Sequence, residues 1–569
     1  MMTTSALPAP PEWLKDAVIY EIYPQSFLDT NGDGIGDLDG VIEKLDYLKW
    51  LGINTIWFNP CFDSPFRDAG YDVADYLRIA PRYGTNETME TLVQEARRRG
   101  IRVLLDLVAG HTSIEHQWFR DSCADQSNHR YVWAPADGDT AATVSGDAYV
   151  PSPGPRTGWY LKNFFAEQPA LNFGYARLDP SEPWRQLPTD EWPRRNREAL
   201  KEIIGFWLDR GVAGFRVDMA FSLVKDDPGL VENSALWREI SRWMHENYPD
   251  AVLLPESDEH RTLAAGQSGG FDGDFALVIQ QEHSALFNNG SVGKLPWQED
   301  DDPCYFDAHV SLADGSAALK RFLGYWQDRW DACGEDRLIV LPSSDHDFSR
   351  VVTGERGIEQ SFAAFTFLLT WGSVPSIYFG DEIGMRNLPD APEKEGSRWN
   401  PKFDRSGCRT PMQWDGGLPN AGFSSARPEY LYLPQDPSKD RPTVAAQLND
   451  PDSLLNHVRA LLALREDHPE LGAGTAARVL NSSYPFVFQR GESYVVAINP
   501  RAETMTARVE CPAGDPELLR GSNATIGDEQ ASSSIASGSG DDAAVTGPTE
   551  SSHLIEVGPF GYGIFRFNR

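Results

Sequence analysis

Gly214-Phe215-Arg216-Val217-Asp218-Met219 is the stretch that decides how the rest of this chain is interpreted. It begins as an apolar strand and ends with a cation and an anion. Because side chains alternate along a strand, Arg216 and Asp218 point to the same face. Charged groups on a strand that should be buried need partners or a function. Taken alone, the pair favours a structural ion pair.

Two further stretches repeat this pattern. Leu253-Leu254-Pro255-Glu256-Ser257 is an apolar run that ends in a carboxylate. Leu338-Ile339-Val340-Leu341-Pro342 is another, and Asp345-His346-Asp347 follow it closely. Three apolar strands that each lead to an acid predict carboxylates that converge at one mouth of a parallel sheet or barrel.

Strand and helix patterns alternate along most of the chain, which predicts an α/β fold, a (β/α)8 TIM barrel. The remaining strands are expected at 17–24, 55–60, 102–108, 275–279 and 376–380, and helices at 38–51, 89–99, 197–210 and 454–465. The sequence divides into a barrel at 1–111 and 181–469, an inserted small domain at 112–180 after the third strand, and a C-terminal antiparallel β domain at 470–569. Within this C-terminal domain, the Ser- and Gly-rich segment 521–550 is predicted to be a mobile insertion.

Composition narrows the range of partners. Acids outnumber bases by 84 to 51, which gives a net charge of −33. Such a chain repels nucleic acid and anionic membranes, so neither is expected as a partner. The expected partner is a small, neutral substrate. Aromatic residues make up 11% of the chain, which suits sugar binding as well as a large core.

No segment predicts secretion, a membrane span or a disulfide framework. The first thirteen residues lack a basic and an apolar region, and the six cysteines form no CxxC pair. The one long uncharged run, Ser361 to Gly380, is interrupted by Ser, Thr, Gly and Pro, which favours a buried helix that leads into a buried strand. We therefore expect a cytoplasmic protein.

The loop from Asp29 to Asp37 has an oxygen-bearing side chain at nearly every second position, with glycines between them. Hard cations such as Ca²⁺ prefer oxygen ligands from tight loops of this kind. The twelfth position is Gly40 rather than Glu, so the loop is not an EF-hand. The alternative is an Asx-rich turn without metal. The pattern favours a structural calcium site.

Several motifs occur together in a fixed order. They are Asp106-Leu107-Val108-Ala109-Gly110-His111, the stretch around Asp218, Glu256, His346-Asp347, Gly70-Tyr71-Asp72, Gln168-Pro169-Ala170-Leu171-Asn172 and the segment from Arg409 to Asp415. With these motifs the chain resembles the α-amylase superfamily, glycoside hydrolase family 13. Within that family it looks most like the oligo-1,6-glucosidase, α-glucosidase and trehalose synthase group.

This resemblance implies a role for each matching residue. Asp218 would be the nucleophile, Glu256 the general acid/base and Asp347 the group that stabilises the transition state. The residues implied to hold the sugar are Asp68, Tyr71, His111, Arg216, His346 and Arg409. Those implied to bind calcium are Asp29, Asn31, Asp33, the carbonyl of Ile35, and Asp37.

Three positions depart from the pattern of this group. Gly110 stands where Asn is usual, at the link between the barrel and the inserted domain, and Ala170 stands where Asp is usual. Met219 follows Asp218, where the group carries Val with α-1,6 specificity and Ala or Thr with α-1,4 specificity. Met matches neither, so the linkage stays open.

The implied activity is that of a retaining, exo-acting α-glucosidase that hydrolyses short α-glucosides by double displacement. Retention places the two carboxyl groups about 5–5.5 Å apart. We expect Arg216, beside Asp218, to keep that carboxylate ionised. A transglucosylase or a trehalose synthase-like isomerase on the same site is the alternative. A non-catalytic binding relative is expected to lack some of the three carboxylates.

Overall fold

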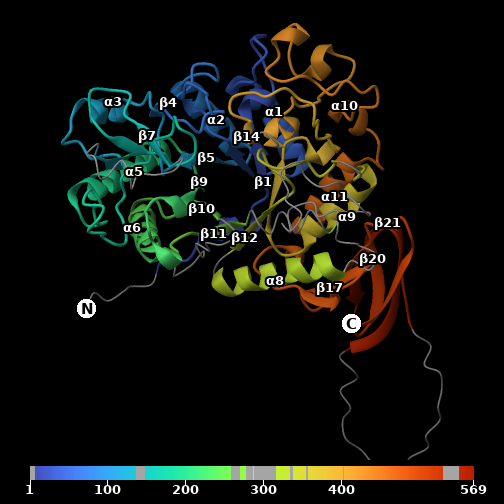
Figure 1. The fold of residues 1–569 in the computed structure, drawn as a ribbon. Coiled ribbons are helices and arrows are strands. Elements are labelled where there is room, and N and C mark those ends of the chain that lie inside the picture. Colours follow the sequence, from blue (N-terminus) through green and yellow to red (C-terminus); the bar gives the residue numbers. More distant parts are fainter. Residues whose placement is uncertain are drawn as a thin grey trace, which may run out of the picture.

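The computed structural model describes residues 7–135, 148–257, 269–276, 286, 316–333, 338–353, 356–400, 403–528 and 550–568. Eight parallel strands close into a barrel in the order β1-β13-β12-β11-β10-β9-β5-β2, with helices around them (Figure 1). The strands are β1 (Ile19–Ile22), β2 (Thr55–Phe58), β5 (Arg102–Val108), β9 (Gly214–Asp218), β10 (Val252–Ser257), β11 (Gly273–Ala276), β12 (Leu338–Pro342) and β13 (Val374–Tyr378). The predicted TIM barrel is confirmed.

The barrel strands are buried on both faces, which is why most of them read as continuous apolar runs. The outer helices are α1 (Leu38–Leu51), α2 (Asn86–Arg98), α5 (Glu191–Leu208), α6 (Val231–Asn247), α8 (Ser316–Cys333), α9 (Ile358–Thr370) and α11 (Leu454–Asp467). Helix α1 begins after Asp37, whose carboxylate accepts a hydrogen bond from the Gly40 N–H, and it ends at Gly52 in the left-handed region. Both ends have preferred capping residues, which explains why its predicted bounds are right.

For two strands, the predicted first residue lies two positions after the observed one. The sixth strand is Gly273–Ala276, whereas the sequence predicted 275–279, of which 277–279 lie outside the described residues. Buried Asp274 hides the start of β11 from an apolar-pattern argument, because it pairs with Arg329 of α8 at 2.7 Å. The eighth strand, β13, starts at Val374 rather than at 376.

The uncharged run at 361–380 contains most of α9 and then all of β13, as expected. Among the described residues, no helix is both long and apolar enough to cross a membrane.

The inserted region after β5 is built around a small antiparallel sheet. Its strands are β6 (Trp133–Ala134), β7 (Tyr149–Pro151) and β8 (Trp159–Leu161), in the order β6-β8-β7, beside α3 (Gln117–Ala124). A bridge between His111 and Ala170 joins the region to the end of β5. The hairpin of β3 (Phe62–Asp63) and β4 (Asp75–Ile79) lies between β2 and α2 in the chain.

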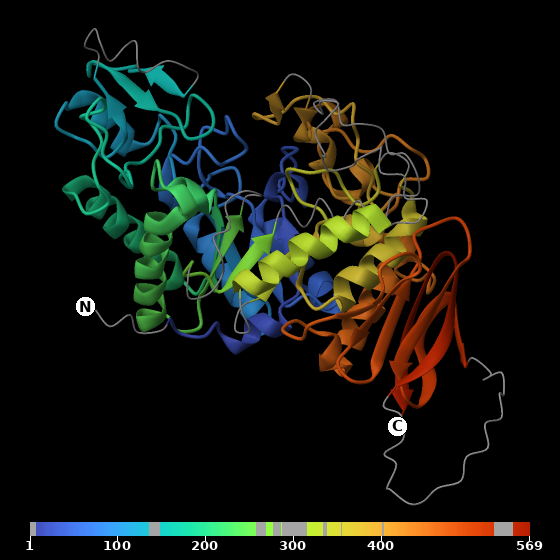
Figure 2. The same cartoon turned by 60° about the horizontal axis from the view of Figure 1, so that its bottom comes forward.

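The C-terminal part is an antiparallel sheet that lies on the opposite side of the barrel from the inserted region (Figure 2). Its strands are β16 (Arg478–Asn481), β17 (Phe486–Arg490), β18 (Tyr494–Ile498), β19 (Met505–Pro512), β20 (Asp515–Asp528) and β21 (Glu550–Asn568). The predicted β domain is confirmed, and the boundaries between the units stay predictions. Short elements α10 (Val444–Gln447), β14 (Arg398–Asn400) and β15 (Phe403–Asp404) lie in the segment before it.

The predicted mobile insertion at 521–550 is partly wrong. Residues 521–528 belong to strand β20, which pairs with β21. The Ser- and Gly-rich composition concealed this strand, because ladder hydrogen bonds come from the backbone and not from the side chains. Residues 529–549 lie outside the described part of the chain.

Candidate active site

Arg216 is the centre of a charged cluster at the carboxyl ends of three neighbouring strands. Its Nη1 lies 3.2 Å from both carboxylate oxygens of Asp106 and 3.4 Å from Oδ1 of Asp218. Its Nη2 lies 2.9 Å from Oε2 of Glu256. Strand β9 pairs with β5 and β10, so the structure places Asp218 and Glu256 at the ends of adjacent strands, as expected. Asp106 was not among the predicted site residues.

Asp218 is almost fully buried, and the effect of burial on its pKa outweighs the effect of the neighbouring Arg216. Burial raises the pKa of Asp218 well above its ordinary value, Glu256 raises it further, and Arg216 only partly opposes them. Arg216 lies 3.4 Å from Asp218 and favours its ionised form, as expected, but burial and Glu256 oppose this effect. The guanidinium is also shared with Asp106 and Glu256. Burial likewise raises the pKa of Asp106 to about 6.

Asp347 has the opposite electrostatic environment. Its Oδ1 accepts hydrogen bonds from Arg405 at 2.7 Å and from Arg409 at 3.0 Å, and its Oδ2 lies 3.4 Å from Nε2 of His346. Burial alone would raise the pKa of Asp347, but His346, Arg405 and Arg409 together hold it far below its usual range. Asp347 is therefore an ionised carboxylate.

Arg405 was missed by the sequence analysis. It donates to Asp347 and also to Oδ1 of Asp68 at 3.1 Å, so one buried side chain joins two site carboxylates. Gln168, from the inserted region, donates to the other oxygen of Asp68 at 2.8 Å. The available signal was a second arginine four positions before Arg409 in the same irregular segment.

Tyr71 connects the two charged groups. Its hydroxyl lies 3.1 Å from Asp106 and 2.7 Å from Nε2 of His346, and its ring stacks on the His346 ring at a centroid distance of 5.5 Å. On the far side, Nδ1 of His346 lies 2.8 Å from the buried carboxylate of Glu21, which also accepts from Asn59. Glu21 and Asn59 were not predicted as site residues, because they lie on β1 and just after β2, far from His346 in the chain.

His111 and Met219 lie next to these groups. Both ring nitrogens of His111 have protein partners, the Tyr71 carbonyl at 3.1 Å and the Asn163 amide at 3.1 Å, and burial lowers its pKa to about 3. Met219 has φ 40° and ψ 44°, in the left-handed region, and its backbone N–H donates to Oε2 of Glu256 at 2.9 Å. A non-glycine residue there stores strain, which is common at functional sites.

The comparison with known families agrees with this geometry. The family model of the alpha amylase catalytic domain matches residues 21–474. The chain belongs to the alpha-amylase family. The match runs from within β1 to beyond α11 and includes all the site residues described in this subsection.

Individual members of the family are similar over most of the chain. The glucan 1,6-alpha-glucosidase of Streptococcus pneumoniae is 32% identical over 494 residues, which cover 80% of this chain and 85% of that protein. The trehalose synthase/amylase of Mycobacterium tuberculosis is 31% identical over 526 residues, 85% of this chain and 80% of that protein. An isomaltulose synthase variant from Erwinia rhapontici NX5, solved with its natural substrate sucrose, has a TM-score of 0.73 and 26% identity, over 99% of this chain and 100% of that chain.

The loop that resembles a calcium site is folded by its own side chains. Asp29 accepts from the N–H groups of Gly32 and Gly34, both at 2.7 Å, and Asp37 accepts from Thr30 as well as capping α1. The residues expected to bind calcium offer only oxygen atoms, which are the ligands that a hard cation prefers. Among the described residues, however, no three His, Cys, Asp or Glu side chains are arranged to hold a metal ion.

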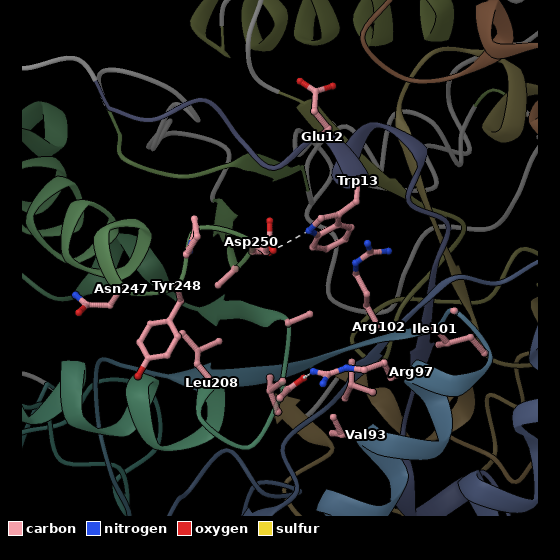
Figure 3. Close-up of a pocket in the computed structure, with 17 residues that line it drawn as sticks. Glu12, Trp13, Val93, Arg97, Ile101, Arg102, Leu208, Asn247, Tyr248 and Asp250 are labelled. Atoms are coloured by element: carbon pink, nitrogen blue, oxygen red, sulfur yellow. Dashed lines mark hydrogen bonds between the residues drawn. The ribbon is translucent and has the colours of Figure 1, made fainter.

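A pocket of about 800 Å³ lies at the other end of the barrel (Figure 3). Trp13, Arg97, Arg102 and Asp250 are among the residues that line it. Arg102 begins strand β5, and Asp106 of the charged cluster lies toward the other end of the same strand. The pocket therefore lies away from the groups that family membership connects with chemistry.

Proposed function

We propose that this protein is a retaining, exo-acting α-glucosidase that hydrolyses short α-glucosides of the maltose and isomaltose type. The observation that carries the proposal is the pair Asp218 and Glu256 on adjacent strands, bridged by Arg216, with ionised Asp347 opposite. Membership of the alpha-amylase family and the α-glucosidases among its relatives support it.

In this proposal the reaction is a double displacement. Glu256 gives a proton to the glycosidic oxygen while the carboxylate of Asp218 attacks the anomeric carbon. The bond between this carbon and the glycosidic oxygen breaks, the rest of the substrate leaves as an alcohol, and a glycosyl–enzyme remains. Glu256 then takes a proton from water, which attacks the same carbon and releases glucose with retained configuration. Asp347, kept anionic by its arginines, stabilises the positive charge that develops on the sugar ring.

The same proposal gives the other site residues a binding role. Asp68, Tyr71, His111, Arg216, His346 and Arg409 hold the hydroxyl groups of the terminal glucose. The contacts of Asp68 with Gln168 and Arg405 support a closed pocket, because they tie the inserted region to the segment before α10 across the mouth. A closed pocket accepts the end of a chain and excludes its middle, so disaccharides are expected to be better substrates than starch.

An NMR time course on maltose, isomaltose and soluble starch tests this function. The expected first product is α-glucose, released much faster from the disaccharides. First release of β-glucose would overturn the double displacement, and rapid internal cleavage of starch would overturn the closed pocket.

The second candidate is glucosyl transfer or isomerisation on the same site, in which a sugar hydroxyl replaces water. It is favoured by the relatives named trehalose synthase and isomaltulose synthase. The covalent intermediate serves both reactions. Incubation with maltose and with sucrose separates them, since conversion mainly to isomeric disaccharides rather than to free glucose would assign the protein to the second class.

A structural calcium ion at the loop Asp29 to Asp37 is also part of the proposal. It would bind the oxygens of Asp29, Asn31, Asp33, the Ile35 carbonyl and Asp37, some of which now accept backbone hydrogen bonds. Metal bound only to the folded state stabilises that state. Elemental analysis of the purified protein and the shift of Tm with a chelator test it, and the absence of any divalent metal together with an unchanged Tm would refute it.

The cytoplasmic location and the lack of nucleic-acid and membrane partners stay predictions from the sequence. Cell fractionation of the source organism checks the first of them.

A further inference from the structure

Asn163 lies just after strand β8 of the inserted region and reaches the end of β5. Its Nδ2 is 3.1 Å from Nδ1 of His111 and 3.2 Å from Oγ of Ser222. Its Oδ1 accepts a hydrogen bond from Nζ of Lys225 at 3.0 Å. A lysine ammonium only donates, so the amide oxygen must face Lys225 and the amide N–H groups must face His111.

This orientation fixes where the proton of His111 is. Because the Asn163 amide donates to Nδ1, that nitrogen must be an unprotonated acceptor, and the ring proton must be on Nε2. Nε2 in turn lies 3.1 Å from the backbone carbonyl of Tyr71, which accepts it. The side chain of the same Tyr71 holds His346 and Asp106. Lys225, Asn163, His111 and Tyr71 thus form one chain of donors and acceptors.

Gly110 provides the space for this arrangement. A Cβ atom at Gly110 would lie 2.9 Å from Nδ2 of Asn163 and 2.7 Å from Oγ of Ser222, closer than van der Waals contact allows. Its φ is not positive, so the glycine is needed for space and not for its conformational freedom. Gly110 was noted in the sequence as a departure at the link between the barrel and the inserted domain. The structure accounts for it, because the Asn163 side chain enters the space that a larger residue would fill.

We propose that Asn163 is a positioning residue of the active site, which with Lys225 holds His111 in its Nε2–H tautomer and thereby orients Tyr71, and that Gly110 is its matched partner. The tautomer is a property of the folded protein. Only the expected effect on turnover rests on the proposed function.

A cavity of about 620 Å³ is lined by Asn163, Met219, Ser222 and Lys225, among others. When the amide is removed, water from this cavity is expected to reach His111. Water both donates and accepts, so only the Tyr71 carbonyl would then still favour the proton on Nε2.

The direct test is the ¹⁵N spectrum of the imidazole rings in histidine-labelled protein, with the His111 signals assigned from their loss in His111→Gln. Wild type is expected to show Nε2–H alone. Asn163→Asp replaces the donor by a carboxylate that still pairs with Lys225, and should place a proton on Nδ1. In Asn163→Ala and Gly110→Ala the amide is lost or displaced, and only the Tyr71 carbonyl still selects Nε2–H. A fraction of Nδ1–H should therefore appear, and kcat on maltose should fall by about 10- to 100-fold, with KM changed less.

The matched control is Gln126→Ala, which removes an exposed amide of the inserted region that bonds Thr157. It should leave both the spectrum and kcat unchanged. The double variant Gly110→Ala/Asn163→Ala should lose less than the sum of the two single losses, because the new Cβ at position 110 no longer meets the Asn163 amide.

A protonated Nδ1 in wild type, or an Asn163→Ala protein with the wild-type spectrum and kcat, would overturn the inference. If the tautomer responds as expected but wild type releases no glucose from any α-glucoside, the positioning inference holds and the proposed function fails.

Discussion

The two ends of the barrel use charged residues in contrasting ways. At the carboxyl ends of β5, β9 and β10, Asp106, Arg216 and Asp218 are buried and have one another as partners. At the amino-terminal end, Arg97 donates to one backbone carbonyl at 3.2 Å and Arg102 lies over the Trp13 ring at 4.5 Å, and both arginines are exposed (Figure 3).

The difference between the two ends lies in burial, which sets how strongly the charges interact. Buried charges interact strongly, so pKa values at the carboxyl end move in opposite directions, up for Asp218 and down for Asp347. Exposed charges are screened by water and ions, so their contacts contribute little. Each prediction below tests this contrast.

The largest effect is expected from the acids at the carboxyl end. Asp218→Asn, Glu256→Gln and Asp347→Asn should each lower kcat by several orders of magnitude while the circular dichroism spectrum stays that of the wild type. Asp250→Asn, at the opposite end, serves as the control and should leave kcat unchanged. Near-normal turnover in one of the three variants would remove that residue from the mechanism.

The next largest effect is expected from Arg405→Met. It leaves Asp68 and Asp347 without their shared cation, and breaking a buried ion pair costs about 3 kcal/mol or more. Arg398→Met is the matched control in the same segment, because its pair with Asp404 at 3.2 Å is formed by an exposed arginine and is worth less than about 1 kcal/mol. Urea denaturation measures both, and equal losses would contradict the contrast.

An intermediate effect on stability, which depends on pH, is expected from Glu382, which follows β13. The hydroxyls of Tyr20 and Tyr47 both donate to its Oε1 at 2.8 Å, and burial raises its pKa to about 7. Between the unfolded pKa near 4.5 and this value, the folded state holds a proton that the unfolded state has lost. Stability from Glu382 is therefore complete below about pH 4.5 and is lost as pH rises through 7.

Glu382→Gln stays neutral and should remove this loss. Measured in urea from pH 5 to 8, the free energy of unfolding of the variant should gain on that of wild type by up to about 3 kcal/mol. A constant difference across this range would mean that Glu382 is ionised in the folded protein.

The smallest effect is expected from Arg102→Gln at the amino-terminal end. The variant loses the contact with the Trp13 ring, which is worth less than about 1 kcal/mol at an exposed site. Differential scanning calorimetry should show a small fall in Tm, and kcat should not change. A large loss of activity would give the amino-terminal end a role that the contrast denies.

The sequence by itself determined the elements and the order of the site motifs. The bounds of α1 and β5 follow from local features, namely a capping carboxylate, a terminal glycine and a continuous apolar run. Acids at the ends of three apolar strands are local features too, so their convergence at one mouth was predictable. Where a strand contains a buried charge, as β11 does at Asp274, the same reasoning was less accurate.

Only the tertiary structure decided how these groups share their charges and protons. Arg216 serves three carboxylates, so its net effect on Asp218 depends on distances that no local pattern encodes. Arg405 lies 337 residues from Asp68 in the chain, yet it binds that residue's carboxylate. Asn163 meets His111 only because Gly110 leaves space between two units of the fold. Sequence patterns specify the type and order of residues, whereas packing in three dimensions sets their distances and burial, which control ionisation.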